Sequence, residues 1–465
     1  MAFFDALDGY GDSPAVFTDS GTTLSYGDLS GIADAIRGAM QPRSLVFVRA
    51  ANHEESLAGY LGCLRGRIVP LLLGAESEPR LDALIEAYAP EYFWLPRSEA
   101  PSLTGFTEVF GAERYVLCRA DRQDAPPLHP DLALLLSTSG STGSPALVRL
   151  SYGNLCSNAS AIAESLAITA DDRPITTLPM QYTYGLSILN SHILRGCAIV
   201  LTARSIAERG FWRRLSSDSA STFGGVPYTY EMLKRLRFST MTVPSLRMLT
   251  QAGGKLALDL SLEFAQLCAA KKIRFVVMYG QTEATARMSY LPSEYAVDKA
   301  GSIGIAIPGG ALWLEDESGV EITADDTDGE LVFRGPNVSM GYAERRADLA
   351  RGDENGGVLR TGDLARRDAA GFYYITGRKK RMLKLFGNRV NLDEVERLLA
   401  KEGWSCACAG TDDHLRVFTV SAAGPEVIRR WLAQQLGIHP TAFEVIPVDA
   451  LPRSESGKIL YSALA

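Results

Sequence analysis

The amino-acid sequence predicts an α/β protein of two or three domains whose last part is a small α+β domain. The chain has 465 residues, enough for more than one hydrophobic core. Over residues 1 to about 130, apolar runs typical of buried strands alternate with amphipathic helical segments. Residues 329–335 and 371–377 alternate polar and apolar side chains as antiparallel strands do. The late part of the chain is therefore expected to be rich in β-structure.

Composition and charge exclude several classes of partner. The chain is 46% hydrophobic and 22% charged, as in ordinary soluble globular proteins, and its net charge of −7 favours neither nucleic acid nor an anionic membrane as a partner. No apolar run reaches the roughly 18–20 residues of a membrane-spanning helix. Residues 1–5 lack the basic and apolar regions of a signal peptide, and the seven cysteines are scattered. We therefore expect a cytoplasmic protein.

The elements of the first 300 residues follow from apolar periodicity and helix caps. Helices are expected over residues 28–40 and 55–64, and Ser151 is a plausible N-cap for a third helix. Residues 178–187 open a further helical stretch. Strands are expected at residues 44–48, 68–73, 198–201 and 275–278.

The end of the chain is predicted to form a separate α+β unit after the basic run 378–381. Asn391 with Glu394 resembles a capping box for a helix over 392–401. Cys406 and Cys408 are expected in one strand and not in a metal site. The remaining elements are strands near 405–409, 415–421 and 443–448 and a helix over 425–436.

A loop rich in serine, threonine and glycine, Ser137–Pro145, lies between apolar runs that look like two buried strands. Its glycines and hydroxyls suit a phosphate, because they turn several hydrogen-bond donors toward one point. A solvated linker has a similar composition. The loop lacks the Gly-Lys-Ser/Thr sequence and the helix start of a Walker P-loop.

Other motifs carry weaker signals when each is taken alone. Thr282 and Glu283 follow the strand 275–278 at its carboxyl end, where open α/β sheets bind ligands. Gly253 and Gly254 indicate a close approach of the backbone. Asp363, between Gly362 and Leu364, can equally be a turn residue, and Lys458 near the C-terminus can be merely exposed.

In their order along the chain, these motifs resemble those of the adenylate-forming superfamily. That superfamily includes acyl- and aryl-CoA synthetases, adenylation domains and luciferases. The resemblance runs from Thr23 to Lys458. It implies a large N-terminal domain, residues 1–380, of mixed packed sheets plus a small β-barrel, followed by a small mobile α+β C-terminal domain, residues 381–465. Where the family usually has an acidic hinge residue, this chain has Arg381.

The resemblance also implies a role for each motif residue, with ATP and Mg²⁺ as cofactors. Thr282 would contact the α-phosphate, Glu283 would hold Mg²⁺, and Lys458 would reach both the substrate carboxylate and the α-phosphate. Gly387 would border the tunnel for the pantetheine thiol. The ATP phosphates would lie on Thr138, Ser139, Gly140, Ser141, Thr142 and Gly143, the adenine near Gly253, Gly254, Tyr279 and Gly280, and the ribose on Asp363 and Arg378.

The implied reaction is ATP-dependent activation of a carboxylic acid as an acyl-adenylate, with release of pyrophosphate. The acyl group would then pass to the pantetheine thiol of CoA or of a carrier protein. Alternatives are an amino-acid adenylation enzyme that loads a carrier protein, a non-catalytic descendant that binds nucleotide or acyl-adenylate, and, remotely, a luciferase-like oxygenase.

Two details of the sequence bear on substrate and rate. The predicted substrate pocket is Tyr182, Thr183, Tyr184 and Gly185, and Thr183 stands where amino-acid activators commonly place an aspartate. A hydroxyl offers no countercharge to an ammonium, which favours a non-amino acid. After the glycine-rich loop the family usually has Pro-Lys, whereas this chain has Pro145 and Ala146. Arg149 is predicted to face the opposite side of the strand from that position.

Overall fold

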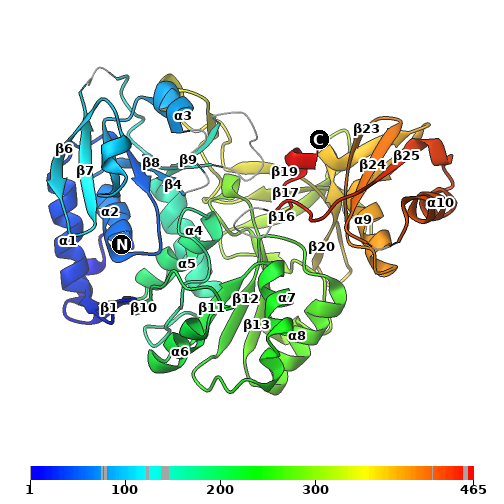
Figure 1. The fold of residues 1–465 in the computed structure, drawn as a ribbon, viewed down its shortest axis with the longest axis horizontal. Coiled ribbons are helices and arrows are strands. Elements are labelled where there is room, and N and C mark those ends of the chain that lie inside the picture. The colour runs from blue at the N-terminus through cyan, green and yellow to red at the C-terminus, as the bar shows by residue number, and fades with distance from the viewer. Residues whose placement is uncertain are drawn as a thin grey trace. The chain divides into compact units, whose positions relative to one another are not determined.

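The computed structural model describes residues 2–74, 77, 81–121, 125–137, 146–421, 423–453 and 459–464 (Figure 1). The chain divides into two compact units. The first contains residues 1–311 and 334–359, and the second contains residues 312–333 and 360–465. Within the described part of the chain, no helix has the length and apolar character needed to span a membrane.

An eight-stranded mixed sheet forms the N-terminal half of the first unit. Its strand order is β18-β9-β8-β4-β3-β5-β7-β6. The central strands β5, β3, β4 and β8 are parallel, and the outer pairs are antiparallel. Its strands are β3 (Leu45–Arg49), β4 (Val69–Leu73), β5 (Tyr92–Pro96), β6 (Phe106–Gly111), β7 (Tyr115–Ala120), β8 (Leu132–Ser137), β9 (Leu147–Ser151) and β18 (Tyr342–Ala343).

Both faces of this sheet are buried. Val46 and Val48 of β3 belong to one apolar cluster, whereas Leu45 and Phe47 belong to another. Because successive strand residues point to opposite faces, these clusters cover the two sides of the sheet. The first cluster includes residues of α1 (Tyr26–Gly38), α2 (Glu54–Arg65), α4 (Tyr152–Ser165) and α5 (Thr183–Ile193), and the second includes residues of α3 (Leu81–Tyr88).

A second sheet of the first unit has the order β11-β12-β13-β14-β15, in which the first three strands are parallel. Helices α4 and α5 pack on each other and also contribute to an apolar cluster with this sheet, so they lie between the two sheets (Figure 1). The strands are β11 (Thr222–Gly225), β12 (Met248–Gln251), β13 (Arg274–Tyr279), β14 (Ser289–Leu291) and β15 (Ile305–Ala306), with helices α6 (Arg209–Ser217), α7 (Pro227–Arg235) and α8 (Leu258–Ala270). A small sheet joins β10 (Ile199–Val200), β1 (Pro14–Phe17) and β2 (Thr23–Ser25).

The second unit begins with a four-stranded sheet in the order β16-β17-β19-β20, formed by β16 (Ala311–Glu315), β17 (Gly329–Arg334), β19 (Val358–Arg367) and β20 (Tyr373–Arg378). A barrel requires its first and last strands to pair, but β16 and β20 are edges of this sheet. The described residues therefore contain an open sheet where a small closed barrel was expected.

The rest of the second unit is the α+β arrangement that the sequence predicts. Its elements are the hairpin β21 (Met382–Leu385) and β22 (Asn388–Asn391), α9 (Leu392–Lys401), β23 (Cys406–Thr411), β24 (His414–Thr419), α10 (Pro425–Leu436) and β25 (Phe443–Pro447). Apolar residues of both helices pack on β24 in one core. Cys406 and Cys408 lie in one strand, as predicted.

Local signals located most helix starts correctly. The Ser151 side chain accepts from the Asn154 amide in a full capping box at the start of α4. At α9, Asn391 accepts from the Asp393 amide, so the cap is present without the predicted reciprocal bond from Glu394. The helix expected to open within residues 178–187 begins at Thr183.

Candidate active site

The loop that follows β13 is sharply folded. Thr282–Ala284 form one 3₁₀ turn, and Thr285 has φ 65° and ψ −59°, the backbone angles of a strained γ-turn. The Ala286 amide closes this turn on the Ala284 carbonyl at 2.7 Å. A Cβ on Gly280 would lie 1.7 Å from the Ala286 carbonyl oxygen, so only glycine permits this backbone approach.

Asn337 holds the loop from the other side. Its Nδ2 donates to the carbonyls of Ala284 and Arg287 at 2.8 and 2.9 Å, and its own carbonyl accepts from the Thr285 hydroxyl at 2.7 Å. The Ser339 amide donates to the Glu283 carbonyl at 2.8 Å. These bonds fix the backbone that carries Thr282 and Glu283.

The Glu283 carboxylate contacts β18, which pairs with the strand that follows the glycine-rich loop. Its Oε1 accepts from the Tyr342 hydroxyl at 2.5 Å. Burial and the Glu283 charge raise the pKa of Tyr342. Tyr342 is in β18, which pairs with β9, and Leu147 of β9 is the partner of both Ala343 and Ser137. The strand after the glycine-rich loop, β9, is therefore the direct neighbour of the strand that contacts Glu283, and β8, before the loop, lies on the other side of β9.

The predicted substrate-pocket stretch contacts two further motifs. The Thr183 hydroxyl donates to the Thr285 carbonyl, and the Tyr184 hydroxyl lies 2.9 Å from the Thr250 carbonyl oxygen. A Cβ on Gly253 would be 2.3 Å from the Tyr182 hydroxyl oxygen, which places that ring directly on the Gly253 turn. Gly254 packs against Pro227, and Gly185 lies against the Pro179 carbonyl.

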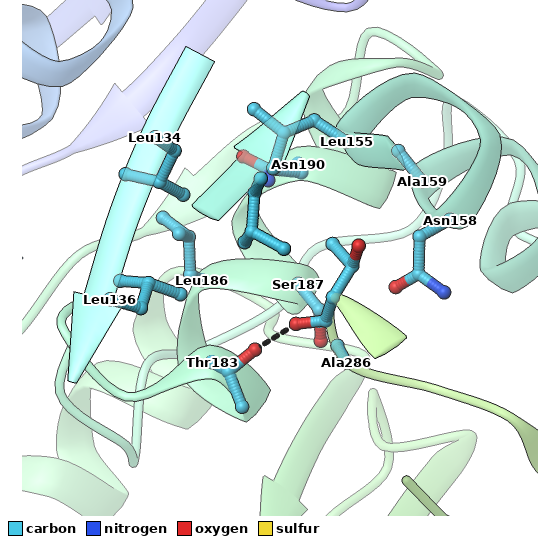
Figure 2. Close-up of a pocket in the computed structure, with 12 residues that line it drawn as sticks. Leu134, Leu136, Leu155, Asn158, Ala159, Thr183, Leu186, Ser187, Asn190 and Ala286 are labelled. Atoms are coloured by element: carbon cyan, nitrogen blue, oxygen red, sulfur yellow. Dashed lines mark hydrogen bonds between the residues drawn. The ribbon is translucent and has the colours of Figure 1, made fainter. Parts of the chain in front are cut away.

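A cavity lies beside these contacts, between α4, α5, β8 and β9 (Figure 2). Figure 2 shows Leu134 and Leu136 on one side and Asn158 and Ala159 on the other, with the Thr183 hydrogen bond at its edge. A second cavity lies between α4, α5, β11 and β12. Among the described residues that line the two cavities there is no aspartate or glutamate.

The second unit brings together the two residues predicted to hold the ribose. Asp363 and Arg378 are cross-strand partners in β19 and β20, and Arg378 Nε donates to Asp363 Oδ1 at 2.8 Å. Asp363 is 2% exposed. Their pairing follows from strand register, because opposite residues of an antiparallel pair lie on the same face.

Gly387 and Arg381 belong to other elements of the second unit. Gly387, with φ +88°, is in the turn between β21 and β22. Arg381 forms ion pairs with Asp393 and Glu396 at 2.5 and 2.6 Å. Lys458, like the loop residues Thr138, Ser139, Gly140, Ser141, Thr142 and Gly143, lies outside the described residues.

Arg149 cannot replace the lysine that the family usually has at position 146, because its guanidinium is bonded to other groups. It is fully buried, and its guanidinium donates to the carbonyls of Met340 and Tyr342 and pairs with Glu354 at 2.5 Å. Its guanidinium is therefore bonded to the segment 340–354.

Sequence reasoning missed Tyr342, Asn337 and Arg287. Tyr342 and Asn337 reach the loop through pairings of distant segments that leave no local signal. Arg287 did carry a signal, because it is a lone charge in the mainly apolar run 284–291.

A family model for AMP-binding enzymes matches residues 3–343. The chain is 31% identical over 342 residues to the 2-succinylbenzoate–CoA ligase of Bacillus licheniformis. The alignment covers 71% of this chain and 69% of that protein. It is 27% identical over 477 residues to the indoleacetate–CoA ligase of Aromatoleum aromaticum, covering 94% and 91%.

Solved structures show the same fold. The O-succinylbenzoate CoA synthetase of Bacillus subtilis, in complex with ATP and magnesium ion, matches with a TM-score of 0.80 at 21% identity, covering 100% of this chain and 99% of that one. ATP-bound MatB of Rhodopseudomonas palustris matches with a TM-score of 0.79 at 24% identity, covering 100% and 98%. Because the family model matches most of its length, the chain belongs to the AMP-binding enzyme family and is an acid–thiol ligase of the adenylate-forming type.

Proposed function

We propose that this protein activates a non-amino carboxylic acid with ATP and transfers the acyl group to CoA. The observation that carries the proposal is the strained Thr282–Thr285 loop, which is held beside the pocket stretch by Thr183 and beside β18 by Glu283 and Tyr342. A backbone held this firmly suits a site that must position phosphate and carboxylate against each other. The curated relatives are CoA ligases, which favours CoA over a carrier protein as the acceptor.

In the first half-reaction a carboxylate oxygen attacks the α-phosphorus of ATP, and pyrophosphate leaves. We assign Thr282 to the α-phosphate, Tyr279, Gly280, Gly253 and Gly254 to the adenine, and Asp363 with Arg378 to the ribose. Lys458 would offset the negative charge of the two anions that approach each other. In the second half-reaction the CoA thiol attacks the acyl carbonyl of the mixed anhydride. The thioester forms, AMP leaves with the electron pair of the broken C–O bond, and the thiol proton is released.

Glu283 fits a magnesium ion. Mg²⁺ in nucleotide sites is usually held by one or two carboxylates together with substrate phosphates and water. Among the described residues no cluster of three or more metal-ligating side chains exists, so Glu283 would act with the phosphates of ATP. When bound, the ion would supply charge neutralisation at the phosphates.

The preference for a non-amino acid rests on the cavity linings. The described residues that line the cavities include no aspartate or glutamate that could pair with an ammonium, and Thr183 stands where amino-acid activators place an aspartate. Arg287, at the second cavity, would repel a cationic group.

A non-catalytic, nucleotide-binding role is the second candidate, because Ala146 replaces the usual lysine and Arg149 is fully engaged elsewhere. Product analysis separates the two. Incubation with ATP, Mg²⁺, CoA and a panel of carboxylic acids is expected to yield acyl-CoA and AMP in equal amounts. ATP consumption to ADP, or none with any acid, would contradict the ligase.

A further inference from the structure

The second cavity, between α4, α5, β11 and β12, holds two basic side chains with unpartnered atoms. Arg287 is 2% exposed and His192 is 3% exposed, and both line this cavity. Arg287 Nη2 and His192 Nε2 are buried and make no hydrogen bond to any described residue. The other walls are largely apolar, with Ile162, Leu166 and Met248 among them.

Arg287 is a buried cation without a counterion among the described residues. Its Nη1 lies 3.4 Å from the sulfur of Met278, and its guanidinium carbon lies 4.2 Å from the centroid of the Tyr184 ring. A ring face and a thioether recover only part of the hydration that a buried guanidinium loses. Burial also lowers the pKa of Arg287, but an arginine keeps its charge in proteins. The Nη2 hydrogens therefore call for an anionic acceptor that the described chain does not supply.

His192 adds an acceptor to the same cavity. Its Nδ1 is 2.8 Å from the Ile188 carbonyl oxygen. A carbonyl can only accept, so Nδ1 carries the proton and Nε2 presents a lone pair. Burial lowers the pKa of His192 to about 4, so the ring is neutral near pH 7.

The position of Arg287 links this cavity to the proposed reaction. Arg287 lies four residues beyond Glu283, and the amides of Asn158 and Asn337 hold its backbone carbonyl. Its guanidinium packs on Tyr184, which belongs to the predicted substrate pocket. Arg287 therefore contacts the predicted pocket stretch from the side of the second cavity.

We propose that the acid activated by this protein carries a second carboxylate, which pairs with Arg287 in this cavity. This inference rests on the proposed acid–thiol ligase activity and narrows its substrate class to dicarboxylic acids. The second carboxylate accepts from Nη2, and His192 Nε2 accepts from a hydroxyl or water beside it. The free space is about 10 Å³, room for one water molecule, so side chains that line the cavity must move when an acid enters.

Calorimetric titration of the full-length protein tests the proposal independently of turnover. The probes are linear α,ω-dicarboxylates of four to eight carbons and terephthalate, each paired with its monocarboxylate, benzoate in the last case. At least one dicarboxylate is expected to bind about 100-fold more tightly than its partner, as for a buried charge pair. Arg287→Met should remove this preference, whereas Arg287→Lys should keep part of it.

Equal binding of both members of every pair, or no binding by any dicarboxylate, overturns the proposal. Arg287 Nη2 and His192 Nε2 would then hold a structural water molecule. The wild-type comparison stands even if a variant fails to fold. Exchange of pyrophosphate into ATP, measured on the same samples, tests the ligase activity separately from the Arg287 subsite. Dicarboxylate preference without exchange contradicts the ligase and supports the subsite. Exchange driven equally by monocarboxylates contradicts the subsite alone.

Discussion

At the scale of single residues, the loop Thr282–Thr285 combines a strained backbone with hydrogen bonds that hold it. A γ-turn at a β-branched residue costs on the order of 1–3 kcal/mol, and such strain persists only where neighbours hold it. Here Asn337 and Thr183 bond the loop on either side of Thr285. The loop carries Thr282 and Glu283, so the strain stands beside the residues to which we assign the phosphate and the metal.

Among the described residues, we expect loss of the Glu283 carboxylate to lower the activity most. Glu283→Gln keeps the shape but removes the charge, and it is expected to lower kcat/KM for acyl-CoA formation by about 10²–10³-fold, in the range of one lost electrostatic contact. Tyr342→Phe should have a smaller effect, because it removes only the hydroxyl that orients the carboxylate. Glu344→Gln, on the exposed segment nearby, is the matched control. A Glu283 variant as active as that control would contradict the assignment.

At the scale of elements, local chemistry predicted most helices and strands but not how the strands assemble. Ser151 located the start of α4, and Pro425 at the first helical position located α10. The apolar run 275–278 lies within β13. In contrast, β18 pairs with β9 across nearly 200 residues, and two residues of strand give no periodic signal. The Tyr342–Glu283 contact was for that reason invisible in the sequence.

Helix α5 carries a group that should make stability depend on pH. The folded protein holds His192 at a pKa of about 4 through burial, with the carboxylate of Asp172 opposing that effect. The unfolded chain therefore binds more protons between pH 6.5 and 4, so stability falls as the pH falls. From pH 7 to 5 the loss from this group is roughly 2 kcal/mol. Chemical denaturation of wild type and His192→Gln across this range measures it. Identical pH slopes would rule out the neutral buried ring.

The hairpin β21–β22 tests the proposed thiol tunnel. Gly387→Trp is expected to leave pyrophosphate exchange intact while it stalls thioester formation. Because Gly387 has φ +88°, any side chain there also strains the turn. Gly387→Ala supplies that strain without the bulk, so it separates the two causes. If the tryptophan and alanine variants form thioester equally well, Gly387 does not border the tunnel.

At the scale of the whole molecule, residues 312–333 and 360–380 belong to the same compact unit as the C-terminal residues. We propose that only residues 381–465 change orientation between the half-reactions, with Arg381 anchored to α9 through Asp393 and Glu396. The motifs in the sequence predicted Asp363 and Arg378 as separate residues. Their contact became apparent only from the register of β19 and β20.

Substitution of Lys458 tests whether the two half-reactions depend on different residues. Lys458→Ala is expected to lose acyl-adenylate formation but still to transfer the acyl group from a supplied acyl-adenylate to CoA, because we assign the lysine to the first half-reaction only. Rapid-quench analysis of both half-reactions gives the answer. Loss of both to the same extent would contradict the separate roles.

The central claim, adenylation of a carboxylic acid, is tested most directly by exchange of labelled pyrophosphate into ATP without CoA. The exchange is expected to require an added carboxylic acid and Mg²⁺, to stop when the metal is chelated, and to fall about 10²–10³-fold in Glu283→Gln. Exchange that proceeds without any carboxylic acid, or fails with every acid that the protein binds, would contradict the account.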